Sequence, residues 1–361
     1  MTTLRLTRRH CLQAAGVFAA ALALGPRSLS AQTAARTVKL GVGLKSLNAS
    51  VINLLIGEAL GYNAAEGFTV KGMAVGGNAN VQVAVDRGDV DIGIGVPSYA
   101  LPILAKGEWG EAINFYQYTY PYKWDVAVKP GAAIKAYTDL KGKNIGVSDF
   151  GGTEYPVTRN VLKNMGIDPD RDVKWTAVGS GVPAGVALQR GAIDALAYYD
   201  TGFGLIEGAG IPFDILTRPT GLPMIGGQFL MALRDRVKNE RALMVGFGRA
   251  AAKSSAFLLA NPTAGAKAFL KLYPETAPRG SSEEEAVKAV LVAISRRVKL
   301  YQAPYDGYKF GQINPDEFTT EMALNGMEAK DLSRFYTNDL IADINAFDVA
   351  AIKAQAMAYN G

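Results

Sequence analysis

The sequence predicts an α/β protein with two similar lobes, each built on a mainly parallel sheet. Two crossover strands are expected to join the lobes, and a helical C-terminal part is expected to follow. Three observations predict this fold. Residues 145–203 repeat the pattern of residues 40–99, apolar strand-like segments alternate with amphipathic segments, and the pattern becomes helical after residue 234. The 40 glycines fit the many tight turns that such a fold needs.

The repeat extends over four predicted elements. Residues 40–42 correspond to residues 145–147, and residues 74–91 align with residues 177–194 with 8 of 18 positions identical. Average residue frequencies would give about one identity by chance. The alternative is that two unrelated strand-helix-strand units share a glycine turn. The almost constant offset along the chain favours a true repeat, and therefore two similar lobes.

Residues 1–31 have the pattern of a cleaved export signal. Arg8 and Arg9 precede a short apolar segment, residues 13–24, which small residues follow. This segment is too short to span a bilayer stably. The arginine pair is twin-arginine-like, and Sec export is the alternative because Cys11 stands where that signal usually has a bulkier apolar residue. The predicted product is periplasmic, and we expect no insertion of the remaining chain into the membrane.

The positive charge of the chain belongs largely to this signal. Removing residues 1–31 lowers Lys+Arg from 38 to 34, against 33 Asp+Glu, and the formal net charge from +5 to +1. This nearly neutral net charge gives no sign that the chain binds nucleic acid or an anionic membrane surface. The remaining length of about 330 residues is enough for two domains.

The inventory of reactive side chains favours a binding protein over an enzyme. His10 and Cys11 are the only histidine and cysteine in the sequence, and both fall within the signal. The rest of the chain therefore offers no disulfide, no thiol nucleophile, no histidine base and no His or Cys metal ligand. Phosphate-binding-loop, calcium-loop and nucleophile-elbow motifs are absent too. We expect no catalytic residues, no metal and no cofactor.

The first lobe is predicted to present one rim of a binding cleft. Helices are expected over residues 51–60, with Asn48 as cap, and over residues 81–87. Ligands of such sheets collect beyond the carboxyl ends of the strands, at the helix N-termini. The predicted strands are residues 38–42, 68–75 and 91–96. The candidate ligand-binding residues of this rim are Lys45, Ser46, Asn48, Gly77, Asn78, Ser98 and Tyr99.

The second lobe is predicted to present a matching rim. Strands are expected over residues 144–147 and 173–178, and a third ends at Asp200. Glycines let the backbone approach a ligand closely, and Thr153 is expected to cap the next helix. The glycine spacing is not that of a nucleotide-binding fingerprint. The candidate ligand-binding residues are Asp149, Gly151, Gly152, Thr153, Glu154, Gly181, Asp200 and Phe203.

Two segments are predicted to connect the lobes. Residues 113–130 alternate in the manner of a strand and form the candidate outgoing crossover, and residues 221–230 form the candidate return. A tyrosine row with this period fits a packed sheet face, and we expect only one or two of these tyrosines, with Tyr120 as the candidate, to reach the cleft together with Trp124. The predicted division gives the first lobe residues 36–120 and 225–361, and the second lobe residues 121–224.

The C-terminal third has the pattern of helices that pack against one lobe and hold it together. Ser282 with Glu285, and Asn314 with Glu317, stand at capping-box spacing. No metal, phosphate or charge-run motif occurs in this part of the sequence. The predicted helices are residues 237–260, 263–273, 282–301, 315–326 and 331–359.

Three short motifs carry a resemblance to a known group. They are residues 139–147 (D-L-K-G-K-N-I-G-V), the Gly-Gly-Thr turn at residues 151–153, and residues 87–93 (R-G-D-V-D-I-G). With the export signal and the repeat, they resemble the periplasmic solute-binding proteins of ABC importers, type II-like in fold. Within these, the chain is most similar to the group that binds aliphatic sulfonates, taurine, nitrate and thiamine pyrimidine precursors. The resemblance covers residues 38–219 well and the helical tail loosely.

This resemblance implies a monomeric clamp that closes by hinge motion on one small-molecule ligand and delivers it to a membrane permease. It maps ligand contacts to residues 45–48, 77–78 and 151–153. Two departures matter. Sulfonate binders of this group often have serine-rich turns followed by a histidine, which this chain lacks. The pyrimidine-forming enzymes of this fold need a histidine and a cysteine cluster, so their absence here also argues against an enzyme.

The sequence leaves the ligand open. Helix N-termini favour an anion such as a sulfonate or carboxylate, whereas the rim acids Asp149, Glu154 and Asp200 have only Lys45 as a rim cation. Acids that line the cleft would call for a donor-bearing ligand, either a zwitterion or an amino-pyrimidine-like molecule. A solvated rim is the alternative for each acid. The alternatives to an importer subunit are an exported enzyme that uses one of these acids as base, and a ligand-sensing subunit of a membrane receptor.

Overall fold

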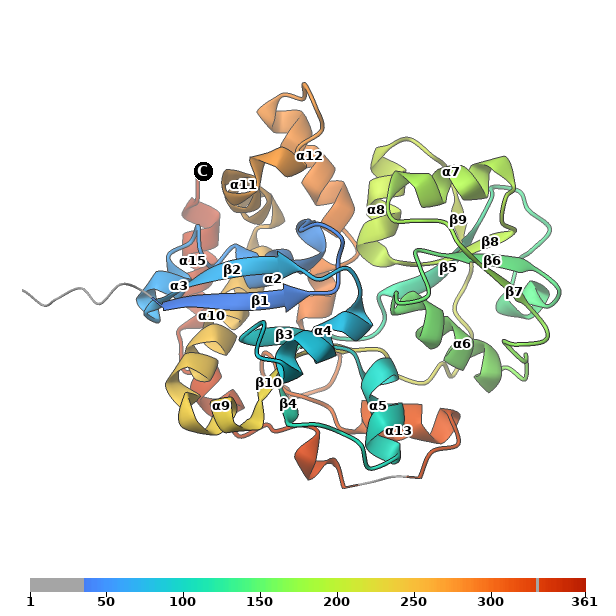
Figure 1. The fold of residues 1–361 in the computed structure, drawn as a ribbon. Coiled ribbons are helices and arrows are strands. Elements are labelled where there is room, and N and C mark those ends of the chain that lie inside the picture. The colour runs from blue at the N-terminus through green and yellow to red at the C-terminus, as the bar shows by residue number, and fades with distance from the viewer. Residues whose placement is uncertain (1–35, 329–330) are drawn as a thin grey trace, which may run out of the picture. The chain divides into compact units, whose positions relative to one another are not determined.

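Two five-stranded sheets, each with helices packed on it, form the framework of residues Thr37–Gly361 (Figure 1). The computed structural model describes residues 36–328 and 331–361. The predicted α/β class with two lobes is confirmed. The predicted export signal, residues 1–31, lies outside the described residues. In the part of the chain that the structure describes, no helix has the length and apolar character needed to cross a membrane.

The first sheet has the strand order β2-β1-β3-β10-β4. β1 and β3 run parallel, with Leu40 opposite Ile92, and β10 runs antiparallel to both β3 and β4. Its strands are β1 (Arg36–Val42), β2 (Phe68–Ala74), β3 (Ile92–Gly95), β4 (Ala112–Thr119) and β10 (Gln228–Leu233).

The second sheet has the strand order β7-β6-β8-β5-β9. β6 pairs in parallel with both β7 and β8, and β5 pairs antiparallel with β8 and β9. Its strands are β5 (Trp124–Val128), β6 (Asn144–Val147), β7 (Lys174–Ala177), β8 (Ala195–Tyr199) and β9 (Asp214–Ile215).

The chain crosses between the sheets twice. It leaves the first sheet after β4 and enters the second at β5, and it returns between β9 and β10. The expected outgoing strand over residues 113–130 is therefore two strands, because its halves belong to different sheets. The crossover strands β5 and β10 run antiparallel to their neighbours. The prediction of mainly parallel sheets is therefore refined, because each sheet contains both parallel and antiparallel strand pairs.

Short helices follow the strands in each lobe. Asn48 is confirmed as a cap, because its side chain accepts a hydrogen bond from the Ser50 N–H. The helix expected over residues 51–60 is wrong in its length: the 3-10 helix η1 (Ala49–Val51) and α2 (Ile52–Leu55) end before Gly57. The other helices of the first lobe are α3 (Tyr62–Ala65), α4 (Asn78–Asp86) and α5 (Pro97–Ala105). Those of the second lobe are α6 (Glu154–Asn164), α7 (Val182–Arg190) and α8 (Asp200–Gly208).

The C-terminal helices follow the prediction in part. The Ser282–Glu285 capping box is confirmed at the start of α12. The box at Asn314 is wrong, because Glu317 turns inward to bond with Gln117 instead of the helix start. The single helix expected over residues 331–359 is three shorter helices. The helices are α9 (Arg234–Asn239), α10 (Arg241–Ala260), α11 (Pro262–Leu272), α12 (Glu283–Ile294), α13 (Asp316–Leu324), α14 (Ile341–Ile344) and α15 (Val349–Ala358), with 3-10 turns η2 (Tyr137–Leu140), η3 (Pro274–Thr276), η4 (Val298–Tyr301) and η5 (Leu332–Arg334).

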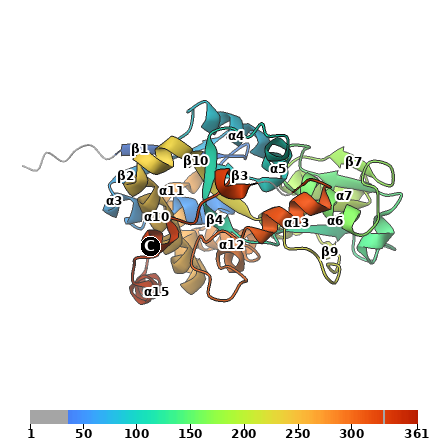
Figure 2. The ribbon, with the colours of Figure 1, turned by 90° about the horizontal axis from the view of Figure 1, so that it is seen from below.

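Two C-terminal helices contact both lobes. α12 packs against α8 of the second lobe and against η1 of the first. α13 contacts both α5 of the first lobe and α6 of the second (Figure 2). The C-terminal part therefore ties the two lobes together, whereas the sequence predicted that it would pad only one.

The contact between α8 and α12 depends on Gly204, and we predict that Gly204→Ala disrupts it. A Cβ at this position would lie 2.5 Å from the Ala293 Cα and 2.6 Å from the Val292 carbonyl oxygen, which are backbone atoms that cannot rotate away. Overpacking of this kind costs about 1–3 kcal/mol of the free energy of unfolding. Urea denaturation measures the loss.

The matched control is Gly208→Ala in the same helix. A Cβ there would have only the Val292 Cγ1 as a neighbour, at an ordinary 3.9 Å. Its free energy of unfolding should change by less than about 0.5 kcal/mol. Equal losses for the two variants would contradict close packing between α8 and α12.

Candidate functional site

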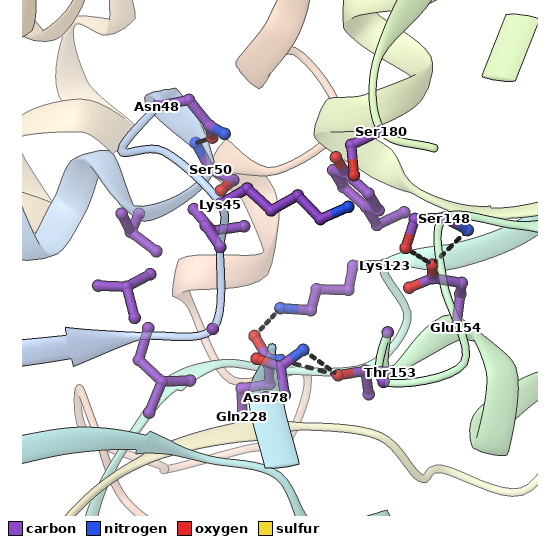
Figure 3. A pocket seen from close by; sticks show the side chains of 18 of the residues that line it. Lys45, Asn48, Ser50, Asn78, Lys123, Ser148, Thr153, Glu154, Ser180 and Gln228 are labelled. Atoms are coloured by element: carbon purple, nitrogen blue, oxygen red, sulfur yellow. Dashed lines mark hydrogen bonds between the residues drawn. The ribbon is translucent and has the colours of Figure 1, made fainter. Parts of the chain in front are cut away.

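A pocket of about 120 Å³, with both polar and apolar side chains in its wall, lies where the two sheets meet, beyond the carboxyl ends of their central strands (Figure 3). Both lobes and the C-terminal part contribute to its wall. The structure brings together most of the predicted rim residues in this wall. These are Lys45, Ser46, Asn48, Asn78, Trp124, Asp149, Gly151, Gly152, Thr153 and Glu154.

The Gly151-Gly152 turn shapes the second-lobe wall of the pocket. Its first N–H, that of Gly151, donates to the Asp149 Oδ1 at 2.8 Å. At Gly152 a Cβ would lie 2.5 Å from the Glu154 Oε1 and 2.6 Å from the Ser148 Oγ. Only glycine lets the turn fold closely over these two side chains, so its role here is to make room for Glu154.

Thr153 links the two lobes instead of capping α6. It stands at the N-cap position, but its side chain makes no capping hydrogen bond, which corrects the prediction. Its Oγ1 accepts hydrogen bonds from the Asn78 Nδ2 at 2.9 Å and from the Gln228 Nε2 at 3.4 Å (Figure 3). Thr153 therefore joins the start of α4 and the start of β10 to the second lobe.

Glu154 is a buried acid of the pocket, with 2% of its surface exposed. Its Oε1 accepts from the Ser148 N–H at 2.9 Å and from the Ser148 Oγ. Burial raises the pKa of Glu154 to about 7, because removing a carboxylate from water disfavours its charged form. The group can hold or release a proton near neutral pH.

Lys123 is a buried cation that the sequence prediction missed. Its exposed fraction is 4%, and its Nζ donates to the Gln228 Oε1 and, at 3.4 Å, to the Thr119 Oγ1. The Nζ also lies 4.8 Å from the centroid of the Trp124 ring. No acid among the described residues pairs with it directly, and burial lowers its pKa well below the usual value.

Arg297 is the second missed cation. It lines the pocket and is 2% exposed, as is its partner Asp200 at the start of α8. The guanidinium donates hydrogen bonds to both carboxylate oxygens of Asp200, with 2.7 Å between Nε and Oδ2, and it also donates to the Ser50 carbonyl. The expectation that Lys45 is the only cation of the rim is wrong.

Several predicted residues lie outside the pocket wall. Asp200 is directed to Arg297, and Tyr120 donates to the Gln312 carbonyl at 2.8 Å, away from the cleft. Phe203 belongs to the core of the second lobe. Gly77 and Gly181 precede α4 and α7 as backbone of the rim turns.

Ser98 and Tyr99, also predicted as ligand contacts, connect the lobes at the edge of the pocket. The Tyr99 hydroxyl donates to the Gly152 carbonyl at 3.0 Å. The Ser98 hydroxyl donates to Glu321 of α13, whose Oε1 also accepts from the Asn160 Nδ2 of α6 at 3.3 Å. These side chains hold the lobes together beside the ligand space.

The fold and the pocket between its lobes define a protein of the periplasmic binding protein fold. The chain belongs to the family described as NMT1/THI5 like, whose family model matches residues 48–265. This confirms the resemblance drawn from the sequence. No curated protein matches the sequence.

Several solved structures share the fold. A protein from Bordetella bronchiseptica RB50 has a TM-score of 0.65 at 23% identity, covering 87% of this chain and 98% of that chain. The alkanesulfonate-binding protein SsuA from Xanthomonas axonopodis pv. citri, bound to MOPS, has 0.59 at 16%, covering 85% and 97%. The desulfurization enzyme DSZB has 0.51 at 14%, covering 86% and 98%. At these identities the likeness shows the fold alone, which binding proteins and an enzyme share.

Breaking the buried ion pair should be costly. We predict that Arg297→Met lowers the free energy of unfolding by about 3–5 kcal/mol, because Asp200 is left as a buried charge without a partner. Adding Asp200→Asn should restore much of the loss. Urea denaturation at pH 7 measures both variants.

The neighbouring Arg296 supplies a matched control. It pairs with Glu207, and the two side chains are 33% and 51% exposed. Arg296→Met should cost less than about 1 kcal/mol, as exposed ion pairs do. An Arg297→Met variant as mild as Arg296→Met would contradict a structural role for the buried pair.

The buried carboxyl of Glu321 predicts a pH dependence of stability. Burial raises its pKa to about 7, so the folded state holds a proton that the unfolded state releases near pH 4.5. Its stabilising contribution is complete below pH 4.5 and is lost as the pH rises through 7. The melting temperature should fall between pH 5 and 8, and Glu321→Gln should reduce that fall by roughly 2–4 °C.

This comparison isolates Glu321 because the other buried groups titrate in wild type and variant alike. Glu154 and Glu317, whose pKa values burial also raises to about 7, act in the same direction as Glu321, and Lys123, whose pKa is lowered, acts in the opposite direction. Glu207→Gln, at an exposed acid, is the control and should leave the slope unchanged. A slope that Glu321→Gln leaves unaltered would show that this carboxyl does not titrate in this range.

Proposed function

We propose that this protein is the periplasmic solute-binding subunit of an ABC-type importer, and that it captures a small polar organic ligand by closing its two lobes. The observation that carries the proposal is the pocket itself. Both lobes contribute to its wall, and the chain crosses between these lobes twice. The wall combines polar and charged side chains with apolar ones. A ligand held between two lobes favours the closed arrangement, as expected of a solute receptor.

Contacts at the edge of the pocket support closure as the working motion. Asn78 and Tyr99 of the first lobe bond to Thr153 and Gly152 of the second. These hydrogen bonds form only when the lobes are together, and they involve the turn that also lines the pocket. Closure and ligand binding therefore use the same short segment.

The enzyme alternative rests on one observation. Glu154 lies in the pocket with a pKa of about 7, a value suited to a general base, and DSZB is an enzyme on this fold. Against it, the sequence after residue 31 contains no histidine or cysteine. Turnover of a bound compound that Glu154→Gln abolishes would favour the enzyme, whereas unchanged recovery of the compound favours the receptor.

Cleavage of residues 1–31, by twin-arginine or Sec export, would release a monomer that delivers its ligand to a membrane permease. We propose residues 36–120 and 225–361 as the first lobe and residues 121–224 as the second. A ligand-sensing subunit of a membrane receptor would use the same closure, and it is the alternative to transport.

Small-angle X-ray scattering tests the closure. A bacterial metabolite extract should lower the radius of gyration of the purified protein, because the lobes close on the ligand. Asn78→Ala removes one hydrogen bond across the cleft and should weaken binding about threefold to tenfold. No compaction with any extract fraction would contradict the proposal.

The matched control is Asn80→Ala in the same helix. The Asn80 side chain donates to the Val75 carbonyl at 3.2 Å within the first lobe and does not reach the second. This variant should bind the ligand as the wild type does. Equal weakening in both variants would show that α4 acts through its fold and not through the contact with Thr153.

A further inference from the structure

Not every charged side chain of the pocket has a partner of opposite charge within the described part of the protein. Arg297 and Asp200 neutralise each other in a buried pair. Lys45 and Asp149 stand nearer the solvent, and Figure 3 shows Lys45 reaching across the pocket toward Ser180. Two buried groups of opposite sign are left, and they come from different elements: Lys123 before β5, and Glu154 at the start of α6.

Lys123 needs an acceptor that the described residues do not supply. An ammonium group has three N–H donors. Two of them are used by the Gln228 Oε1 and the Thr119 Oγ1, which are both uncharged acceptors. Burial without a counter-charge disfavours the charged form of a lysine, and no ion pair with an acid is found for this one in the described part of the chain. An anionic group of a ligand in the pocket would supply both the acceptor and the charge.

Glu154 needs a donor in the same way. Its Oε1 accepts both bonds from Ser148, while no described donor bonds to its Oε2. A carboxylate can accept about four hydrogen bonds, so half of this group is available to a ligand. The same small pocket therefore contains a lysine that needs an anionic acceptor and a carboxyl that needs a hydrogen-bond donor.

From these two unmatched groups we infer the class of ligand: a small dipolar molecule that places an anionic group at Lys123 and an N–H donor, either an ammonium or an amino-heteroaromatic group, at Glu154. The inference rests on the proposed solute-binding function and narrows it. A plain anion would satisfy Lys123 but leave Glu154 as an unmatched buried charge, which must then take up a proton. A plain amine would leave Lys123 unmatched.

Charge fractionation of a bacterial metabolite extract tests the ligand class. One portion is passed over a strong cation exchanger at acidic pH, which removes compounds that carry a basic nitrogen. A second portion is passed over a strong anion exchanger at alkaline pH, which removes acids. Each flow-through is then scored by the compaction and the thermal stabilisation that it gives. We expect both columns to deplete the activity.

The outcomes separate this inference from the function on which it rests. Activity removed by the anion exchanger alone would identify a plain anion, and activity removed by the cation exchanger alone would identify a plain amine. Either result overturns the dipolar ligand and leaves solute binding intact. The absence of activity even in the unfractionated extract would contradict the proposed function itself.

Variants of the two groups give a second readout with the recovered ligand. Lys123→Gln and Glu154→Gln should each raise the dissociation constant about tenfold to a hundredfold, as loss of a charged hydrogen bond does. Glu207→Gln, at an exposed acid of α8, should leave it unchanged. A Glu154→Gln or Lys123→Gln variant that binds as well as the wild type would overturn the inference.

Discussion

The buried ion pair between Arg297 and Asp200 is the interaction on which the two-lobed arrangement depends. It joins the segment after α12 to the start of α8, and Arg297 also donates to the Ser50 carbonyl of the first lobe. Separating the two charges is costly, because either group alone in the interior costs several kcal/mol. The pair therefore keeps the start of α8 joined to the segment after α12 beside the pocket, and it leaves Asp200 unavailable to a ligand.

Other contacts between the lobes follow the same pattern. The crossover strands carry the chain between the sheets, and α13 places Glu317 and Glu321 where the lobes meet. Glu317 accepts from Gln117 of β4 and from the Gly227 N–H just before β10, so one carboxyl bridges both crossovers on the side of the first sheet. Polar contacts of this kind can be exchanged for water when the lobes separate, which a continuous apolar interface would resist.

The sequence predicted those features that depend on local pattern. Strand, glycine turn and helix recur in both copies of the repeat, so the rim residues Lys45–Asn48 and Asp149–Glu154 were found from their position after a strand. Arg297 is 97 residues from Asp200 and lies in the turn between α12 and η4, where the sequence has no motif, so nothing local marked it. Lys123 had one signal, its place beside Trp124 where the crossover enters the second sheet. For Thr153 the sequence predicted the position at the start of the helix, but it did not predict the hydrogen bond with Asn78, 75 residues earlier.

The most direct test of closure on a ligand is the distance between the lobes, measured by double electron–electron resonance. Spin labels at Arg87→Cys, just after α4, and Arg190→Cys, at the end of α7, lie on exposed positions of the two lobes. Cys11, the only native cysteine, would be replaced by serine. The account predicts a broad distribution that becomes shorter and narrower when the metabolite extract is added. A distribution that stays unchanged while a ligand is bound would contradict it.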